Sequence, residues 1–77
     1  MRTLITGASG LLGGHLITSL QERGHEIHAL ALENEDTSRL EARGVTIHRG
    51  DIRNAETLTP AMDGVDLVFH LAGMMGF

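Results

Sequence analysis

The sequence contains no cysteine, tryptophan, tyrosine or lysine among its 77 residues. Without cysteine, the chain cannot form a disulfide framework, a thiolate zinc site or a cysteine nucleophile. Without lysine, and with a formal net charge of −4, it lacks the cationic surface that nucleic acids and anionic membranes require. We therefore expect neither a nucleic-acid partner nor a membrane partner.

Long hydrophobic runs are also missing from the sequence. No window contains the ~18 uninterrupted apolar residues of a membrane span, and no basic segment precedes an apolar one at the N-terminus. These two features predict a cytoplasmic protein. A chain of 77 residues is expected to form one small domain, or part of a larger one, of marginal stability.

A glycine-rich loop stands out in the N-terminal part of the chain. It joins a short apolar run at residues 4–6, which predicts a strand, to a helical pattern of leucines that begins at residue 11. Gly7 permits a tight turn, Gly10 lets a ligand approach the backbone, and Gly13 lets the helix lie against the sheet. The free N–H groups at the helix start favour a pyrophosphate. The alternative interpretation is a strand-to-helix turn that binds nothing.

The rest of the chain alternates predicted strands and helices. The patterns predict helices over residues 11–23, 38–43 and 55–63, and strands over residues 26–32, 45–49 and 65–71. Gly24 and Gly44 suit left-handed C-caps of the first two helices. Ser38 and Glu41 resemble a capping box, and Asn54 is suited to cap the third helix.

Two expectations concern packing in the C-terminal part of the chain. The third helix should turn Leu58 and Met62 inward, and Pro60 should kink or shorten it because proline lacks the backbone N–H. One face of the last strand should carry its alternating apolar residues, Val65, Leu67, Phe69 and Leu71.

Together these elements predict an α/β fold with the element order βαβαβαβ. Right-handed crossovers and a switch point after the first strand imply a four-stranded parallel sheet with the strand order 3-2-1-4. Such a sheet is half of a doubly wound fold. We expect residues 1–77 to form a single dinucleotide-binding half-domain and to be a fragment of a larger enzyme fold.

Three motifs occur together at a characteristic spacing: TGASGLLG at residues 6–13, RGDI at 49–52 and VFHLAG at 68–73. This combination resembles the N-terminal half of the Rossmann domain of the extended short-chain dehydrogenases/reductases, the NAD-dependent epimerase/dehydratase type. The resemblance implies NAD or NADP as the cofactor. NAD is slightly favoured because no arginine stands close in the sequence to the end of the second strand.

The resemblance also implies which residues contact the cofactor. The pyrophosphate would lie on the glycine loop, at Gly7, Gly10, Leu11, Leu12 and Gly13. Asp51 would accept a hydrogen bond from the adenine amino group, with Ile52 beside the ring. The nicotinamide-side ribose would lie against the end of the last strand, at Leu71, Ala72 and Gly73. A turn residue that caps the next segment is the alternative role for Asp51.

The sequence departs from the family pattern at two places. The acid or arginine that family members use at the adenosine ribose should stand at residues 31 or 32, which are Ala31 and Leu32 here. Glu33 follows Gly13 by 20 residues, the usual distance, and we take it as the candidate although it comes two positions late. The catalytic Tyr-x-x-x-Lys pair has no counterpart, so the resemblance implies a chain that is inactive alone.

Three functions remain open at this point. The leading hypothesis is a dinucleotide-binding fragment of an epimerase/dehydratase-type oxidoreductase or isomerase without its catalytic segment. The alternatives are a non-enzymatic self-associating module and an NAD(P)-sensing regulatory domain. We expect a homo-oligomer joined at the strand 65–71, because this edge carries no lysine or proline that would block pairing. The five histidines are spread over the first helix and three strands, with His25 and His28 at the same strand, and they predict no metal site.

Overall fold

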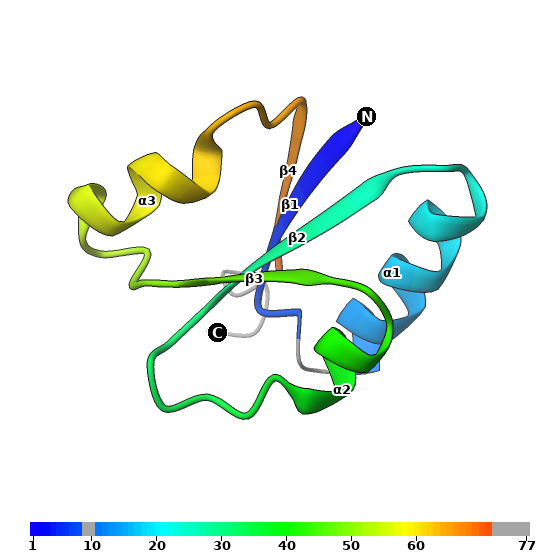
Figure 1. The fold of residues 1–77 in the computed structure, drawn as a ribbon, viewed down its shortest axis with the longest axis horizontal. Coiled ribbons are helices and arrows are strands. Elements are labelled where there is room, and N and C mark those ends of the chain that lie inside the picture. Colours follow the sequence, from blue (N-terminus) through cyan, green and yellow to red (C-terminus); the bar gives the residue numbers. More distant parts are fainter. Residues whose placement is uncertain (9–10, 72–77) are drawn as a thin grey trace.

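The computed structural model describes residues 1–8 and 11–71, except for the side chains of residues 11 and 12. A parallel sheet lies between helices on its two faces (Figure 1). The elements follow one another as β1 (Arg2–Thr6), α1 (Leu11–Glu22), β2 (Glu26–Ala31), α2 (Ser38–Ala42), β3 (Thr46–Arg49), α3 (Ala55–Met62) and β4 (Leu67–His70). In this part of the chain no helix is both long and apolar enough to cross a membrane.

The sheet confirms the predicted α/β class and topology. All three strand pairings are parallel, and the strand order is β3-β2-β1-β4. At the centre of the sheet, Ile5 of β1 pairs in register with Ala29 of β2 and with Phe69 of β4. Because the strands are parallel, their carboxyl ends meet at one edge, where the loops after β1, β2 and β3 come together.

Two apolar clusters hold the layers together, one on each face of the sheet. The larger cluster lies on the side of α1 and α2 (Figure 1), and its buried members are Ile5, Ala8, Ile17, Leu20, Ile27, Ala29, Leu40, Val45 and Leu71. The smaller cluster lies under α3 and contains the buried residues Leu4, Leu30 and Ala61. Since each fully buried Leu or Ile contributes roughly 1.5–3 kcal/mol, the α1 side supplies most of the hydrophobic stabilisation.

The helix caps agree with the sequence patterns at three of four places. Gly24 and Gly44 have φ values of +82° and +81°, as left-handed caps require. The side chain of Asn54 accepts from the amide of Glu56 at the start of α3. The prediction of a capping box at Ser38 and Glu41 was wrong, because the N-cap of α2 is Thr37 and not Ser38.

The side chain of Asp36 explains this shift of one residue. Its Oδ1 atom accepts from both the amide and the hydroxyl of Ser38, at 3.0 and 2.8 Å. The hydroxyl of Ser38 is therefore engaged with the preceding turn. Instead, the buried Thr37 donates its hydroxyl to Oε2 of Glu41 at 2.9 Å.

The inner face of α3 differs from the prediction. Leu58 packs against the α3-side cluster as expected, but Met62 is 45% exposed and Ala61 is buried instead. Leu58 and Ala61 are three residues apart and therefore lie on the same face of the helix, whereas Met62 is turned about 100° further around the axis. The helix ends at Met62, two residues after Pro60 and one residue earlier than predicted.

The last strand is shorter than predicted and does not carry its apolar residues on one face. Phe69 and Leu71 pack with the α1-side cluster, but Val65 packs with the α3-side cluster. Asp66 accounts for the difference, because its amide donates to the carbonyl of Arg2 and its carboxylate accepts from the amide of Arg2, both at 2.8 Å. These two bonds fix the chain just before the regular strand begins at Leu67.

Candidate functional site

A sharp turn follows β1 at the carboxyl edge of the sheet. Gly7 has φ = +74°, in the left-handed region that side chains with a Cβ adopt only with strain. The chain turns at Gly7, and α1 begins at Leu11. The expected role of Gly7 is confirmed, and Gly10 lies outside the described residues. Leu11 and Leu12 form the start of α1, as the pyrophosphate hypothesis requires.

Gly13 brings the first turn of α1 against the loop that follows β1. A Cβ at this position would lie 2.3 Å from the carbonyl oxygen of Ala8 and 2.7 Å from its Cα. No rotation of a side chain relieves this overlap, because both atoms belong to the backbone. The sequence predicted that Gly13 lets the helix approach the sheet, and the structure shows that the close approach is to the backbone of the loop.

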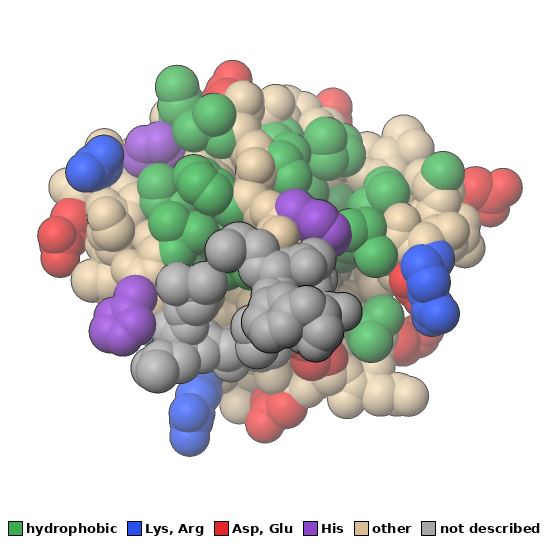
Figure 2. Space-filling model, turned by 180° about the vertical axis from the view of Figure 1, so that it is seen from behind, with side chains coloured by type: hydrophobic (Ala, Val, Ile, Leu, Met, Phe, Trp, Pro, Cys, Tyr) green, Lys and Arg blue, Asp and Glu red, His purple; other side chains and the backbone are tan. Residues whose placement is uncertain are grey.

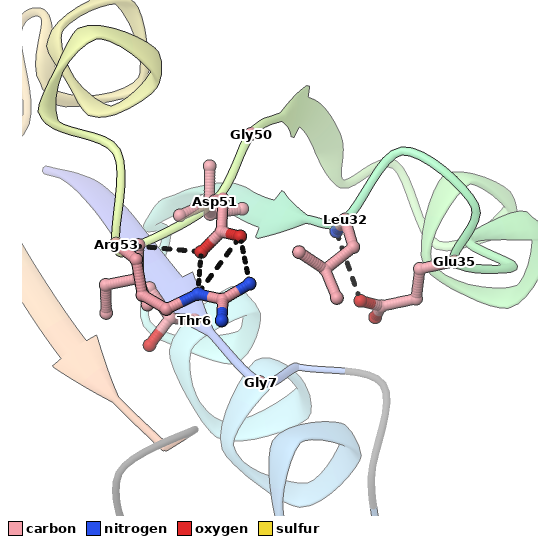
Figure 3. Close-up of a pocket in the computed structure, with 9 residues that line it drawn as sticks. Thr6, Gly7, Leu32, Glu35, Gly50, Asp51 and Arg53 are labelled. Atoms are coloured by element: carbon pink, nitrogen blue, oxygen red, sulfur yellow. Dashed lines mark hydrogen bonds and ion pairs between the residues drawn. The ribbon is translucent and has the colours of Figure 1, made fainter.

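A pocket of about 290 Å³ opens beside the Gly7 turn, at the ends of β1, β2 and β3 (Figure 3). The residues that line it are Thr6, Gly7, Leu30, Leu32, Glu35, Gly50, Asp51, Ile52 and Arg53. Apolar walls with a few polar groups at the rim suit a flat organic ligand. The structure thus brings the predicted site residue Gly7 to the same pocket as Asp51 and Ile52, which lie more than 40 residues further along the sequence.

Asp51 carries the strongest electrostatic feature of the pocket. Arg53 donates from Nη2 to Oδ2 at 2.7 Å and from its amide to Oδ1 at 2.9 Å. These bonds lower the pKa of Asp51 to about 2, so the carboxylate is ionised at neutral pH. Asp51 both caps the turn that precedes α3 and lines the pocket, and the two roles predicted as alternatives are compatible in one geometry.

Thr57 of α3 fixes the backbone of this turn. Its hydroxyl oxygen accepts from the amide of Asp51 at 2.9 Å. A Cβ at Gly50 would lie only 2.7 Å from the Cβ of Thr57, so glycine allows the helix to come this close. The position of the Asp51 carboxylate is therefore set by both β3 and α3.

The loop after β2 places a different acid at the pocket from the one expected. Glu33 is exposed and lines a neighbouring recess, together with Leu32 and Arg49 among others. Glu35 lines the main pocket, and its Oε1 atom accepts from the amide of Leu32 at 3.3 Å (Figure 3). The spacing from the glycine loop gave no signal for Glu35, because the loop has to fold back before this residue reaches the end of β2.

Arg49, at the end of β3, holds this folded loop in place. Its Nη1 atom donates to the carbonyl oxygens of Leu32 and Glu35, and its Nη2 atom donates to the hydroxyl of Thr37, each at 2.8 Å. The sequence argument for NAD rested on the absence of an arginine near residue 32 along the chain. In the folded structure Arg49 contacts Leu32 and Arg53 lines the pocket, so this argument does not extend to the arginines that are close in space.

Within the described residues, the end of β4, which the resemblance assigns to the nicotinamide-side ribose, does not line this pocket. The side chain of Leu71 is 7% exposed and belongs to the hydrophobic core, while its amide donates to the carbonyl of Thr6 at 3.0 Å. Ala72 and Gly73 lie outside the described residues. Thr6 and His70 join the ends of β1 and β4 through a 2.7 Å hydrogen bond between Oγ1 and Nδ1.

No group of three or more His, Cys, Asp or Glu side chains is arranged to hold a metal ion within residues 1–8 and 11–71.

Comparisons with known proteins place this geometry in context. A 3-beta-hydroxysteroid dehydrogenase from Mycolicibacterium neoaurum is 40% identical over 75 residues, which are 96% of this chain and 20% of the relative. The crystal structure of gox2253 superposes with a TM-score of 0.81 and 36% identity, and the match covers 90% of this chain and 21% of that one. The crystal structure of isoflavone reductase matches with a TM-score of 0.77 and 26% identity over 90% of this chain and 26% of that one.

The chain spans about a fifth to a quarter of the length of four curated relatives that it matches. The profile of the NAD dependent epimerase/dehydratase family matches residues 3–77, which is nearly the whole chain. The order of the strands, the glycine turn and these relatives agree with that match. The chain therefore belongs to the NAD dependent epimerase/dehydratase family.

Proposed function

We propose that the chain binds the adenosine and pyrophosphate part of NAD or NADP at the carboxyl ends of β1, β2 and β3. The observation that carries this proposal is the single pocket that joins the Gly7 turn to Asp51 and Ile52. When bound, the cofactor would supply a nicotinamide ring that accepts or donates hydride. The residues of this chain bind and orient the other end of the molecule.

The residues present fit such a cofactor. The first turn of α1 contains no acidic residue, so the positive end of the helix dipole is available to the pyrophosphate. Gly13 leaves no Cβ where the helix meets the loop. Leu30, Leu32 and Ile52 provide apolar surface for the adenine ring, and the ionised carboxylate of Asp51 accepts from its amino group.

We propose Glu35 as the residue that contacts the adenosine ribose, in place of Glu33. A carboxylate at this position accepts hydrogen bonds from the two ribose hydroxyls and repels the 2′-phosphate of NADP. Arg53 does not offset this repulsion, because its guanidinium is engaged by Asp51. The proposed preference for NAD therefore rests on the carboxylate of Glu35, and not on the absence of an arginine near residue 32 in the sequence.

We further propose that the chain is the cofactor-binding half-domain of an oxidoreductase or isomerase of this family, located in the cytoplasm. The chain has no tyrosine and no lysine, so its 77 residues contain no acid/base pair of the family type. It should transfer no hydride by itself. An NAD(P)-sensing domain would use the same binding site and differ only in passing a signal to a partner.

One observation supports the self-associating alternative, and the two functions are compatible. β4 pairs with β1 alone among the described strands, and its residues Leu67 and Val68 are 38% and 47% exposed. Figure 2 shows hydrophobic side chains at the surface of the molecule seen from behind. A second copy of this chain would cover the exposed strand by pairing edge to edge.

Calorimetric titration with ADP, NAD and NADP tests the binding proposal. We expect dissociation constants of tens of micromolar or weaker, which corresponds to about −6 kcal/mol, because half of the ligand stays in water. Ile52→Asp should weaken ADP binding by about tenfold or more, since it places a charge beside the base. Met62→Asp is the matched control, because Met62 is equally exposed but lies outside the pocket. No heat from any of the three nucleotides at millimolar concentration would refute the proposal.

A second titration tests the assignment of the ribose contact. Glu35→Gln should weaken NAD binding several-fold, by about 0.5–1.5 kcal/mol for a lost hydrogen bond, and should improve NADP binding relative to NAD. Glu33→Gln is the control and should change neither affinity. If Glu33→Gln changes the ratio of the NAD and NADP affinities and Glu35→Gln does not, Glu33 is the residue that contacts the ribose.

A further inference from the structure

Four charged or titratable side chains form a connected row across β1, β2 and β3 on the face that α3 covers. Glu26 accepts through Oε2 from Nε of Arg2 and from Nε2 of His28, the latter at 2.6 Å. Nδ1 of His28 lies 2.7 Å from Nε2 of His48. Side chains thus connect three strands, and none of these four residues lines the pocket.

The contact between the two histidines joins the edge strand β3 to the interior strand β2. His28 is in register with Thr46, and His48 is in register with Leu30, so the two rings are diagonal neighbours. The rings are stacked, with an interplanar angle of 16° and centroids 5.0 Å apart. His28 is only 7% exposed, so little water reaches this contact while it is closed.

The number of protons that the pair can hold follows from the chemistry of imidazole. Nε2 of His28 faces a carboxylate and therefore carries a hydrogen. The contact between Nδ1 of His28 and Nε2 of His48 requires one nitrogen to donate and the other to accept. If both rings are protonated, two N–H groups face each other and two positive charges lie side by side.

The surroundings favour a single charge on the pair. Burial lowers the pKa of His48, and the charges of His28 and Arg2 lower it further. Glu26 is the neighbouring acid on β2, and bonds from His28 and Arg2 lower its pKa.

The other elements packed on this face add no second acid to the pair. From β4, Asp66 bonds the amide of Arg2 and His70 bonds Thr6. From α3, Glu56 is the titratable residue, and it is exposed.

We propose that His28 and His48 form a pH-sensitive clamp on β3. The clamp holds while the two rings share at most one positive charge, and it opens when both rings are protonated. β3 is the strand that leads into Gly50 and Asp51, and the amide of Gly50 continues the ladder by donating to the carbonyl of Ala31 at 2.9 Å. Opening the clamp therefore loosens the strand that carries one wall of the pocket.

Amide hydrogen exchange of the native protein tests this inference. Between about pH 7.5 and about pH 5, after correction for intrinsic exchange rates, protection of the β3 amides and of Gly50 should fall at least about tenfold more than that of β1. His48→Gln keeps a neutral hydrogen-bonding side chain and should abolish this difference. His15→Gln, on the exposed face of α1, is the matched control and should leave it unchanged.

A second measurement keeps the inference testable if the His48 variant fails to fold. The ring resonances of His48 in the unmodified chain should change with pH over the same range in which the β3 amides lose protection. A change of the His48 resonances in a range in which β3 stays protected would overturn the clamp. Parallel loss of protection in β3 and β1 would overturn it as well.

Discussion

The two ends of the parallel sheet contain similar charged side chains, but these side chains make different contacts at each end. At the amino end, Arg2 donates from its amide to Asp66, from Nε to Glu26 and from Nη1 to the carbonyl of Asp63. These groups satisfy one another, and together they attach β2 and the segment before β4 to β1.

At the carboxyl end, Arg49 and Arg53 are also engaged by protein groups: Arg49 by backbone carbonyls of the loop after β2, and Arg53 by the carboxylate of Asp51. Asp51 and Glu35 both line the pocket, together with the exposed apolar residues Leu32 and Ile52. The turn at Gly7 and the absence of a Cβ at Gly13 let α1 lie close to the loop after β1. The pocket opens beside this turn. The comparison teaches that glycine and exposed apolar residues, more than charge itself, distinguish the end of the sheet that carries the proposed binding pocket from the end that Arg2 holds together.

The largest expected effect concerns the glycine that shapes the carboxyl edge. Gly13→Ala should destabilise the fold by about 3 kcal/mol or more, because its Cβ meets the backbone of Ala8 at 2.3 Å. Gly14→Ala is the neighbouring control, since the nearest atom to its Cβ is Nη1 of Arg43 at 3.7 Å. That control should gain about 0.5–1 kcal/mol from helix propensity. Urea unfolding of the two variants measures both values, and equal effects would show that the short contact does not matter.

The next effect concerns the exposed strand that the amino-end bonds hold against β1. We expect a homodimer at micromolar concentration, and Val68→Asp should weaken its association at least about tenfold, or 1.4 kcal/mol, by placing a charge on the edge. Sedimentation of the unmodified chain and of the variant measures this change. Met62→Asp again serves as the control, because it is an exposed apolar residue on α3. A compact monomer that unfolds cooperatively would contradict the prediction.

A smaller effect should show whether the amino end and the carboxyl end of the sheet act independently. Arg2→Met retains the apolar stem and removes the bonds to Glu26 and Asp63, so it should lower stability by up to about 1 kcal/mol, the range of partly exposed ion pairs. ADP affinity should not change, because Arg2 does not line the pocket. Thermal unfolding and calorimetry on the same sample provide the two values. A loss of affinity greater than the loss of stability would show that the two ends are coupled.

The smallest effect is the dependence of stability on acid pH. The folded-state pKa values of Asp51 and Glu26 lie below their usual ones, so each contributes stability above its ordinary pKa that is lost as the pH falls through the folded value. Stability should therefore decline below about pH 4.5 and continue to fall toward about pH 2. Arg53→Met should return the pKa of Asp51 toward 3.8 and leave Glu26 unaffected, as carboxyl resonances measured by NMR would show.

The sequence by itself determined the elements, their order and the topology of the sheet. The caps at Gly24, Gly44 and Asn54 depend on backbone atoms a few residues away, and such local interactions are readable from a single sequence. The strand order follows from the alternation of elements and from the handedness of crossovers. Gly7, Asp51 and Ile52 were predicted as site residues by motif, and the fold brings all three to one pocket.

Only the tertiary structure decided which side chains face the pocket and which face the core. Glu35 replaces Glu33 at the pocket because Arg49, from another strand, folds the loop back. Val65 leaves the face of Phe69 because the bonds between Asp66 and Arg2 fix the chain ahead of the strand. In both cases the deciding partner is distant along the sequence, so no local period or spacing contains the information. The direction in which a side chain faces, in a loop or at the start of a strand, depends on contacts that form only when the chain has folded.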